Sequence, residues 1–359
     1  MSIAHTKLHH FNQFTIATFL ACLLLVSSSN NASLGSGLPG SSAQEGDPLQ
    51  IVTTIAIPYE IAMKIAGEHA DIMSIVDSAT DIHSFDGPTI QQIQAMLEAD
   101  VIFSLGIAGS EPWLANIVED NPSLSGLIVP LANLLEDGYA DPLLDGEINP
   151  HVWMNPYTMK SMANITTAKL LQLDPDHSAD FLAQNITYQT QLDFLIDNIA
   201  GNRTAYFDGL KVVVNHPAYI YLFDLLGVER LRAIELHSGG EPGQATINEI
   251  IQTMETENCS LIVTDPQHSV ANAEEIARAT GAKIAEMSAI PGIYPNFAVL
   301  DYITMMEYCM ESLLHPVEVP AETIPGFPIF GFLGLFGITA LLLQKKTKNT
   351  MRFENEPKC

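Results

Sequence analysis

The chain has 359 residues, of which 47% are apolar, and its formal net charge is −27. This length is enough for two domains of ordinary size, and the apolar content supports real hydrophobic cores, which excludes a disordered chain. The large excess of acidic residues argues against nucleic acid and against an anionic membrane surface as partners. It fits a secreted surface that is rich in solvated carboxylates, or a surface that faces a salty medium.

The N-terminus is typical of a secretory signal. Lys7 precedes an apolar run from Phe14 to Val26, and small and polar residues follow that run. The run is too short for a comfortable membrane span. We therefore predict a signal peptide over residues 1–34, followed by a flexible leader over residues 35–48 that is rich in glycine and serine.

A regular alternation of strand-like and helical patterns begins after the leader and predicts an α/β fold with a parallel sheet. The apolar runs that we expect to form its strands lie at 49–57, 71–76, 101–105 and 127–131. Thr89 is expected to cap the helix that follows the second of them. We assign residues 49–173 to an N-terminal lobe. The acidic segment 133–149 is predicted to be a solvated loop, or alternatively a lip that attracts cations to a site.

A long helix is predicted between two α/β units. Asp174-Pro175 combines an N-cap with a proline at the first helical position, and the apolar periodicity after it ends at Gly201. A helix over residues 174–202 would span roughly 40 Å at 1.5 Å per residue. The second unit, residues 203–315, has expected strands at 211–214, 231–236, 260–264 and 282–285 and a final helix at 297–314.

The C-terminal region predicts a membrane anchor. Ile324–Leu343 carries no charge and is long enough to cross a bilayer as a helix. Lysines follow it at once, which places the tail, residues 344–359, on the cytoplasmic side. Residues 316–323 would be a linker. The body of the protein is then expected on the extracellular face of the cell membrane.

Histidines supply the candidate site. His151 lies between Pro150 and Pro156 in a segment that the two prolines stiffen, and His83 and His216 each follow a strand-like run. Loops after the strands of an α/β sheet are where such proteins gather their binding residues. Neutral imidazoles that converge from separate loops suit zinc, which binds nitrogen in tetrahedral geometry.

Two further histidines, His237 and His268, also follow strands of the second unit, and their roles stay open. Glu286 and Asp265 are nearby candidates for a general base. They leave a second interpretation, an extracellular zinc hydrolase, because three histidines with an open fourth position also describe catalytic zinc. The sequence offers no positioned general base, so we expect a binding protein and not an enzyme.

These motifs resemble those of the zinc- and manganese-type solute-binding receptors of metal-importing ABC transporters, over Gln50 to His315. Asp81-Ile82-His83-Ser84-Phe85 is similar to the family's Asp-Pro-His-x-Tyr, Asn149-Pro150-His151-Val152-Trp153 to its Asp-Pro-His-Val-Trp, and Asn215-His216-Pro217-Ala218 to the segment of the third ligand. The resemblance implies two α/β lobes with parallel sheets, joined by one long helix, with the metal site in the cleft between the lobes.

The resemblance also implies the ligands, the ion and the partner. His83, His151 and His216 would bind zinc, and the permease of an ABC importer would receive it. Manganese is less favoured, because manganese-type members place carboxylates where His216 stands and near Met287-Ser288, and both are absent here. A surface adhesin of the same fold, which acts without metal, is a third interpretation.

Two smaller expectations complete this picture. Cys259 and Cys309 lie in the part expected outside the cell, where an oxidising environment favours pairing. Zinc-type relatives can carry cysteines at these two places, so a disulfide is predicted. Ile324-Pro325-Gly326-Phe327 resembles an archaeal Pro-Gly-Phe surface-sorting signal at the start of the anchor.

Overall fold

The computed structural model describes residues 47–77, 80, 82, 85–107, 110–133, 137–235 and 242–320. The predicted signal peptide, the predicted anchor and tail, and His83 lie outside these ranges. The chain divides after Asp47, and the described elements belong to the unit that begins at Pro48. In these described ranges, no helix combines the length and apolarity that crossing a membrane requires.

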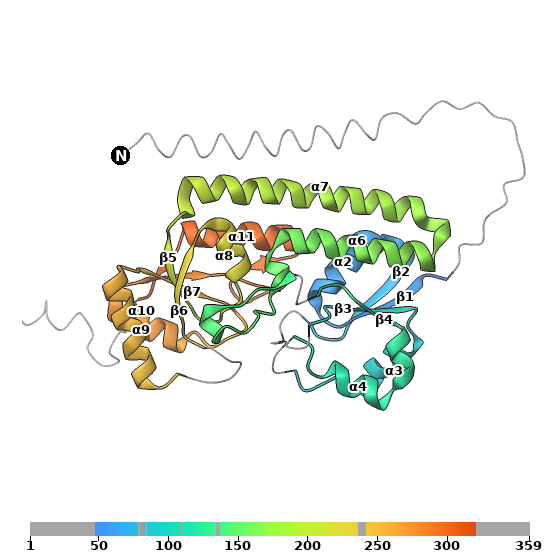
Figure 1. The fold of residues 1–359 in the computed structure, drawn as a ribbon, viewed down its shortest axis with the longest axis horizontal. Helices are drawn as coiled ribbons and strands as arrows, with labels where there is room; N and C mark the ends of the chain where they lie inside the picture. The colour runs from blue at the N-terminus through green and yellow to red at the C-terminus, as the bar shows by residue number, and fades with distance from the viewer. Residues whose placement is uncertain are drawn as a thin grey trace, which may run out of the picture. The chain divides into compact units, whose positions relative to one another are not determined.

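The first sheet has four parallel strands in the order β2-β1-β3-β4 (Figure 1). Its strands are β1 Leu49–Thr53, β2 Ala70–Ser74, β3 Val101–Ser104 and β4 Ile128–Pro130. The helices between them are α2 Ala56–Ala66, α3 Ile90–Glu98 and α4 Leu114–Asp120. Every residue of β3 is buried, as expected for an interior strand of a parallel sheet that is covered on both faces.

The second sheet has the order β11-β8-β7-β5-β6, and its pairs are parallel except β11 with β8. Its strands are β5 Lys211–Val214, β6 Glu229–Ala233, β7 Leu261–Thr264, β8 Lys283–Glu286 and β11 Val317–Glu318. Its helices are α8 Ile220–Leu226, α9 Gln244–Glu257, α10 Ala271–Thr280 and α11 Tyr302–Leu314. A small antiparallel hairpin pairs β9 Gly292–Ile293 with β10 Ala298–Val299.

Helix α6 and the longer helix α7 connect the sheets in the sequence. Helix α6 Pro156–Leu173 begins after Asn155, whose side chain accepts a hydrogen bond from the Tyr157 backbone N–H. Helix α7 Ser178–Asn202 has 25 residues, or about 38 Å. It packs against α2 and α6 of the first part and against α8 and α11 of the second (Figure 1). The predicted long linking helix is therefore confirmed.

Short helical turns also lie among the described residues. They are Gly67–His69, Pro122–Gly126, Pro142–Leu144, Val152–Met154 and Pro175–His177, and a π-type turn at Arg203–Phe207. The fold is therefore α/β, with two parallel sheets and one long helix between them, as the sequence predicted.

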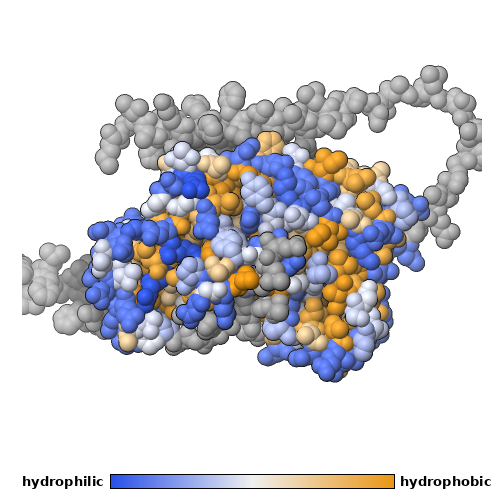
Figure 2. Space-filling view, viewed as in Figure 1, coloured by the Kyte–Doolittle hydropathy of each residue, from blue (hydrophilic) through white to orange (hydrophobic). Residues whose placement is uncertain are grey.

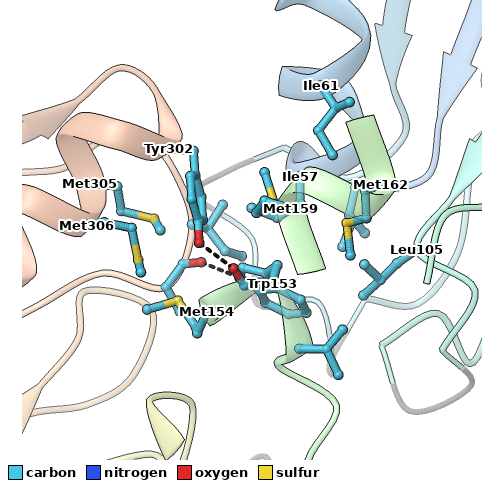
Figure 3. Packing of buried hydrophobic residues seen from close by; sticks show 14 of the residues in the cluster. Ile57, Ile61, Leu105, Trp153, Met154, Met159, Met162, Tyr302, Met305 and Met306 are labelled. Atoms are coloured by element: carbon cyan, nitrogen blue, oxygen red, sulfur yellow. Dashed lines mark hydrogen bonds between the residues drawn. The ribbon is translucent and has the colours of Figure 1, made fainter. Parts of the chain in front are cut away.

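The hydrophobic core joins elements that are far apart in the sequence. Figure 3 shows side chains of α2, α6 and α11 packed around Trp153, which is fully buried. The Trp153 indole N–H donates to the Ala289 carbonyl at 2.6 Å, and the Tyr302 hydroxyl donates to the Trp153 carbonyl at 2.7 Å. Because both bonds are buried, they fix the segment that carries His151 against the second sheet's side of the molecule.

Side-chain caps explain two helix starts, one predicted and one not. Thr89 caps α3 in a capping box with Gln92, which confirms its predicted role. Helix α11 begins at Tyr302 and not at Phe297, because Asp301 caps it in a second capping box and the residues before it form the β9–β10 hairpin.

In the view of Figure 2, larger apolar areas lie on the right, over the first sheet, while the left side is mainly hydrophilic.

The predicted disulfide is wrong for this structure, in which Cys259 and Cys309 are both free and buried. Cys259 belongs to the hydrophobic cluster of Val213 and Ile262, whereas Cys309 belongs to that of Val214 and Val263. Successive residues of a strand point to opposite faces of the sheet. The two cysteines therefore lie on opposite faces of the second sheet and cannot bond through it.

Candidate metal site

The centre of the site is a pair of histidines. His151 begins the short turn before α6, and His216 lies two residues after β5. Their side chains belong to residues that are only 5% and 6% exposed, and their Nε2 atoms are 3.3 Å apart. The structure thus brings together two of the three predicted ligands, and the third, His83, lies outside the described residues.

The Asn149 side chain fixes the ring of His151. Its amide Nδ2 donates to Asp141 Oδ2 at 2.9 Å and to the Pro217 carbonyl at 2.6 Å. Its Oδ1 must therefore be an acceptor, and it lies 3.0 Å from the His151 backbone nitrogen and 2.8 Å from His151 Nδ1. The neutral His151 ring consequently carries its proton on Nδ1 and its lone pair on Nε2, as metal-ligating histidines commonly do.

A buried ion pair holds Asn149 in turn. The guanidinium of Arg230 on β6 donates to both oxygens of Asp141, at 2.8 and 3.0 Å. The side chains of Asp141 and Arg230 are 0% and 7% exposed. Burial alone would raise the pKa of Asp141, but the hydrogen bonds and charge of Arg230 outweigh it and leave this pKa below its ordinary value. The acidic segment was predicted to be solvated, and for Asp141 this prediction is wrong. Its carboxylate is buried and paired with Arg230.

His268 and Asp265 flank the pair on the other side. Asp265 follows β7 directly, and its Oδ1 is 2.5 Å from His268 Nδ1. The His268 ring stacks on the His216 ring, with centroids 4.3 Å apart and planes inclined by 13°. The sequence left the role of His268 open, and the structure places it beside the pair. His237, the other such histidine, lies outside the described residues.

A small cavity joins these groups. It measures about 30 Å³ and is lined by Ile82, His151, Trp153, His216, Ala218, Asp265, Gln267, His268, Ala289 and Ile290. This volume suits one ion or one or two waters and is too small for an organic solute. Ile82 lies directly before His83 in the sequence, so the chain next to the third predicted ligand reaches the same cavity.

A larger cavity of about 690 Å³ lies elsewhere, between α2 and the hairpin. Glu60, Lys64 and Asp301 are its buried or half-buried charged groups. None of its described lining residues is a histidine or a cysteine, so it offers no nitrogen or sulfur ligand. Of these two cavities, the small one presents imidazoles.

The chemistry available at the small cavity is the capture of an ion. Two imidazoles present adjacent Nε2 atoms, and a buried carboxylate lies beside them. Among the described residues, no three His, Cys, Asp or Glu side chains already form a complete ligand group. Sequence reasoning proposed His151 and His216, which meet at this cavity. It gave no such role to Asp141 and Arg230, which lie 89 positions apart and carry no local motif.

The fold and the cavity together define a two-part α/β binding protein with an ion-sized site. A family model described as zinc-uptake complex component A, periplasmic (ZnuA), matches residues 51–315. Because this match covers well over half of the sequence, the chain belongs to that family of metal-binding components of ABC importers.

Individual relatives agree with this membership. The chain is 27% identical over 207 residues, 56% of its length and 67% of the relative's, to a protein named manganese-binding lipoprotein MntA from Halalkalibacterium halodurans. It is 22% identical over 306 residues, 82% of its length and 94% of the relative's, to the high-affinity zinc uptake system protein ZnuA of Bacillus subtilis. The first relative is named for manganese and the second for zinc, so these names do not identify the ion that this protein binds.

A solved structure shares the fold. The periplasmic zinc binding protein TroA from Treponema pallidum superposes with a TM-score of 0.65 at 19% identity, over 75% of this chain and 98% of that one. The family consists of binding proteins that act outside the cytoplasm. The chain is therefore a metal-binding component of uptake and not an enzyme, and the hydrolase interpretation is wrong.

Proposed function

We propose that this protein captures zinc outside the cytoplasm and delivers it to the permease of an ABC importer. His83, His151 and His216 would be its protein ligands. We also propose that residues 49–173 and 203–315, which precede and follow the linking helix in the sequence, form the two predicted lobes. Ligands drawn from both lobes would release the ion when the lobes move apart.

The spacing of the two imidazoles carries this proposal. Two ligands of a tetrahedral ion with Zn–N bonds of about 2.0–2.1 Å stand about 3.3–3.4 Å apart. The Nε2 atoms of His151 and His216 are 3.3 Å apart, so zinc could enter between them with little rearrangement. The hydrogen bond from His151 Nδ1–H to Asn149 supports the same assignment, because it leaves the lone pair on Nε2.

A ligand set rich in nitrogen favours zinc over manganese. Manganese prefers oxygen ligands, and it stands below zinc in the order of affinities for nitrogen sites. Position 216, where manganese-type receptors place a carboxylate, holds a histidine. Copper would bind such a site at least as tightly in a test tube, so affinity alone does not identify the physiological ion.

Zinc titration of a histidine variant tests the proposal. The His151→Ala protein should bind zinc at least ~100-fold more weakly, because it loses one of the proposed protein ligands. His315→Ala is the matched control, since His315 ends helix α11 with its side chain 65% exposed. Wild type and control should bind zinc tightly and manganese weakly. Unchanged zinc binding by His151→Ala, or manganese binding as tight as zinc, would overturn the proposal.

We also propose that the segment 324–343 tethers the protein to the membrane, as its uncharged sequence predicts. Deleting every residue after Glu322 should release a folded, zinc-binding protein into the medium. Full-length protein should stay in the membrane fraction. A truncated protein that remains membrane-bound would show that another segment, such as the N-terminal apolar run, is the anchor.

A further inference from the structure

We propose that Asp265 supplies the fourth, anionic ligand of the metal site, through its Oδ2 atom. This assignment rests on the proposed binding of an ion between His151 and His216. The site would then be closed by a carboxylate of the protein and not by water. His268 would be a positioning residue that holds the carboxylate without touching the ion.

The register of the second sheet places Asp265 beside His216. Strands β5 and β7 are parallel neighbours in which Val213 pairs with Ile262 and Val214 with Val263. The pairing continues past the strand end, because the Asn215 backbone N–H donates to the Val263 carbonyl at 2.7 Å. The same register sets His216 opposite Asp265. Backbones of adjacent strands lie about 4.8 Å apart, so these two side chains leave the sheet as neighbours.

The two carboxylate oxygens of Asp265 differ in their hydrogen bonding. Oδ1 accepts from the Gln267 backbone N–H at 3.2 Å and lies 2.5 Å from His268 Nδ1. Oδ2 is buried and has no hydrogen-bond partner among the described residues. A buried carboxylate oxygen without a partner is costly, and such groups in proteins usually bind something. Asp265 lines the cavity that His151 and His216 also line.

The geometry of His268 explains why it holds the carboxylate and does not bind the ion. A histidine binds a metal in the plane of its ring. The rings of His268 and His216 are stacked nearly in parallel, 4.3 Å between centroids, so an ion in the plane of His216 lies well out of the plane of His268. The hydrogen bond between His268 Nδ1 and Asp265 Oδ1 holds one carboxylate oxygen, so Oδ2 is the oxygen that can turn towards the ion.

A competing carboxylate, Glu286, is placed less well. It ends β8, the next strand of the sheet, but it does not line the small cavity. Both of its oxygens accept from Asn296 Nδ2, at 3.1 and 3.3 Å. The described side chains do not yet form a complete group of three ligands, so Asp265 would join the two histidines by a side-chain movement when the ion arrives.

Metal titrations of the full-length protein test the assignment, with Asp265→Asn as the test variant and Glu286→Gln as the matched control. Asp265→Asn should weaken zinc binding by roughly tenfold or more. It should weaken manganese binding more than zinc binding, because it removes the hard oxygen ligand. Glu286→Gln should behave as wild type in both titrations.

The visible spectrum of bound cobalt(II) distinguishes a metal ligand from a residue that only supports the fold, because the spectrum responds to the groups bound to the ion. When cobalt fills the wild-type site, added azide should leave the visible spectrum unchanged, because Asp265 occupies the fourth position. In cobalt-loaded Asp265→Asn, azide should enter that position and shift the spectrum. If the variant folds poorly, the azide titration of cobalt-loaded wild type still tests the assignment.

Several outcomes would overturn the assignment. They are wild-type zinc affinity in Asp265→Asn, an equal loss in Glu286→Gln, and an azide-sensitive spectrum in cobalt-loaded wild type. His151→Ala, titrated in parallel, separates this failure from failure of the site as a whole. If His151→Ala loses zinc while Asp265→Asn keeps it, only the carboxylate assignment is wrong. If both keep zinc, the proposed site is wrong as well.

Discussion

The side-chain amide of Asn149 donates a 2.6 Å hydrogen bond to the backbone carbonyl of Pro217. This bond fastens the segment that carries His151 to the loop that carries His216. The other end of the same amide accepts from the His151 ring. One neutral side chain therefore sets both the orientation of one imidazole and its distance from the other.

We expect Asn149→Ala to weaken zinc binding by about 10–100-fold, which is the usual effect of removing a group that orients a metal ligand. The reason is that His151 loses the acceptor for its Nδ1–H, and the two loops lose the bond between them. Competition with a chromophoric zinc chelator measures the change. Asn164→Ala, on the exposed side of α6, is the control and should bind zinc as wild type does. Equal affinities in the two variants would contradict the role of Asn149.

The ion pair beneath Asn149 should matter for stability. Arg230→Ala leaves the buried Asp141 carboxylate without its cation, and breaking such a pair typically costs about 3–5 kcal/mol in the free energy of unfolding. Arg232→Ala on the same strand is the matched control, because its pair with Glu249 has side chains 39% and 66% exposed. That change should cost less than about 1 kcal/mol. Urea unfolding of metal-free protein gives both values, and similar losses would refute the difference.

The same pair predicts a response to acid. Because the pKa of Asp141 is lowered in the folded protein, its contribution to stability is present above the ordinary carboxyl pKa and is lost as the pH falls through the folded value. Between the two pKa values the unfolded chain binds a proton that the folded chain does not bind. The difference in stability between wild type and Arg230→Ala should therefore shrink in strong acid. A constant difference down to about pH 2 would count against this account.

The sequence predicted those parts of the molecule that depend on local chemistry. The strand at Lys211–Val214 has the predicted bounds, and the helix before Gly227 ends there because this glycine adopts the left-handed conformation, with φ of 73°. His151 and His216 could be proposed because stiff or post-strand loops present ligands in this class of fold. These signals are all carried by a few adjacent residues.

Contacts between distant segments could not be predicted in this way. Nothing near Asp141 indicates that Arg230 would bury it, and an acidic run is usually solvated. The cysteines show the same limit. Cys309 lies on α11, and only the packing of that helix decides which face of the sheet it covers. His268 could not be assigned because its stacking on His216 depends on the register of β5 and β7.

The cysteines should behave as two separate buried thiols. Burial raises the pKa of the Cys309 thiol to about 12, so its reactive thiolate form is scarce in the folded protein. Iodoacetamide should leave Cys309 unmodified under native conditions. After unfolding without a reductant, the peptides that contain Cys259 and Cys309 should both be alkylated, as mass spectrometry can show. Alkylation that requires prior reduction would reveal a disulfide and contradict the structure.

Glu60 should make the metal-free protein less stable as the pH rises through neutrality. It lies on α2, is 7% exposed, and accepts a 2.7 Å hydrogen bond from the Tyr302 backbone N–H at the start of α11. Burial, and secondarily the charge of Asp301, raises its pKa from 4.5 to about 7, although Tyr302 and Lys64 oppose the shift. Between these pKa values the folded chain binds a proton that the unfolded chain has released. Stability is therefore full below the lower value and is lost as the pH rises through the higher one.

A comparison of Glu60→Gln with Glu68→Gln isolates this contribution. Each pKa unit corresponds to about 1.4 kcal/mol, so Glu60 should remove on the order of 2–3 kcal/mol of stability between pH 5 and pH 8. Glu60→Gln keeps a hydrogen-bond acceptor for the Tyr302 N–H but cannot ionise, so its free energy of unfolding should fall less over this range. Glu68 is exposed, and Glu68→Gln should lose stability as wild type does. Urea unfolding at both pH values, with a chelator present to exclude metal, gives the slopes. If Glu60→Gln and wild type lose the same stability between these pH values, the raised pKa of Glu60 is wrong.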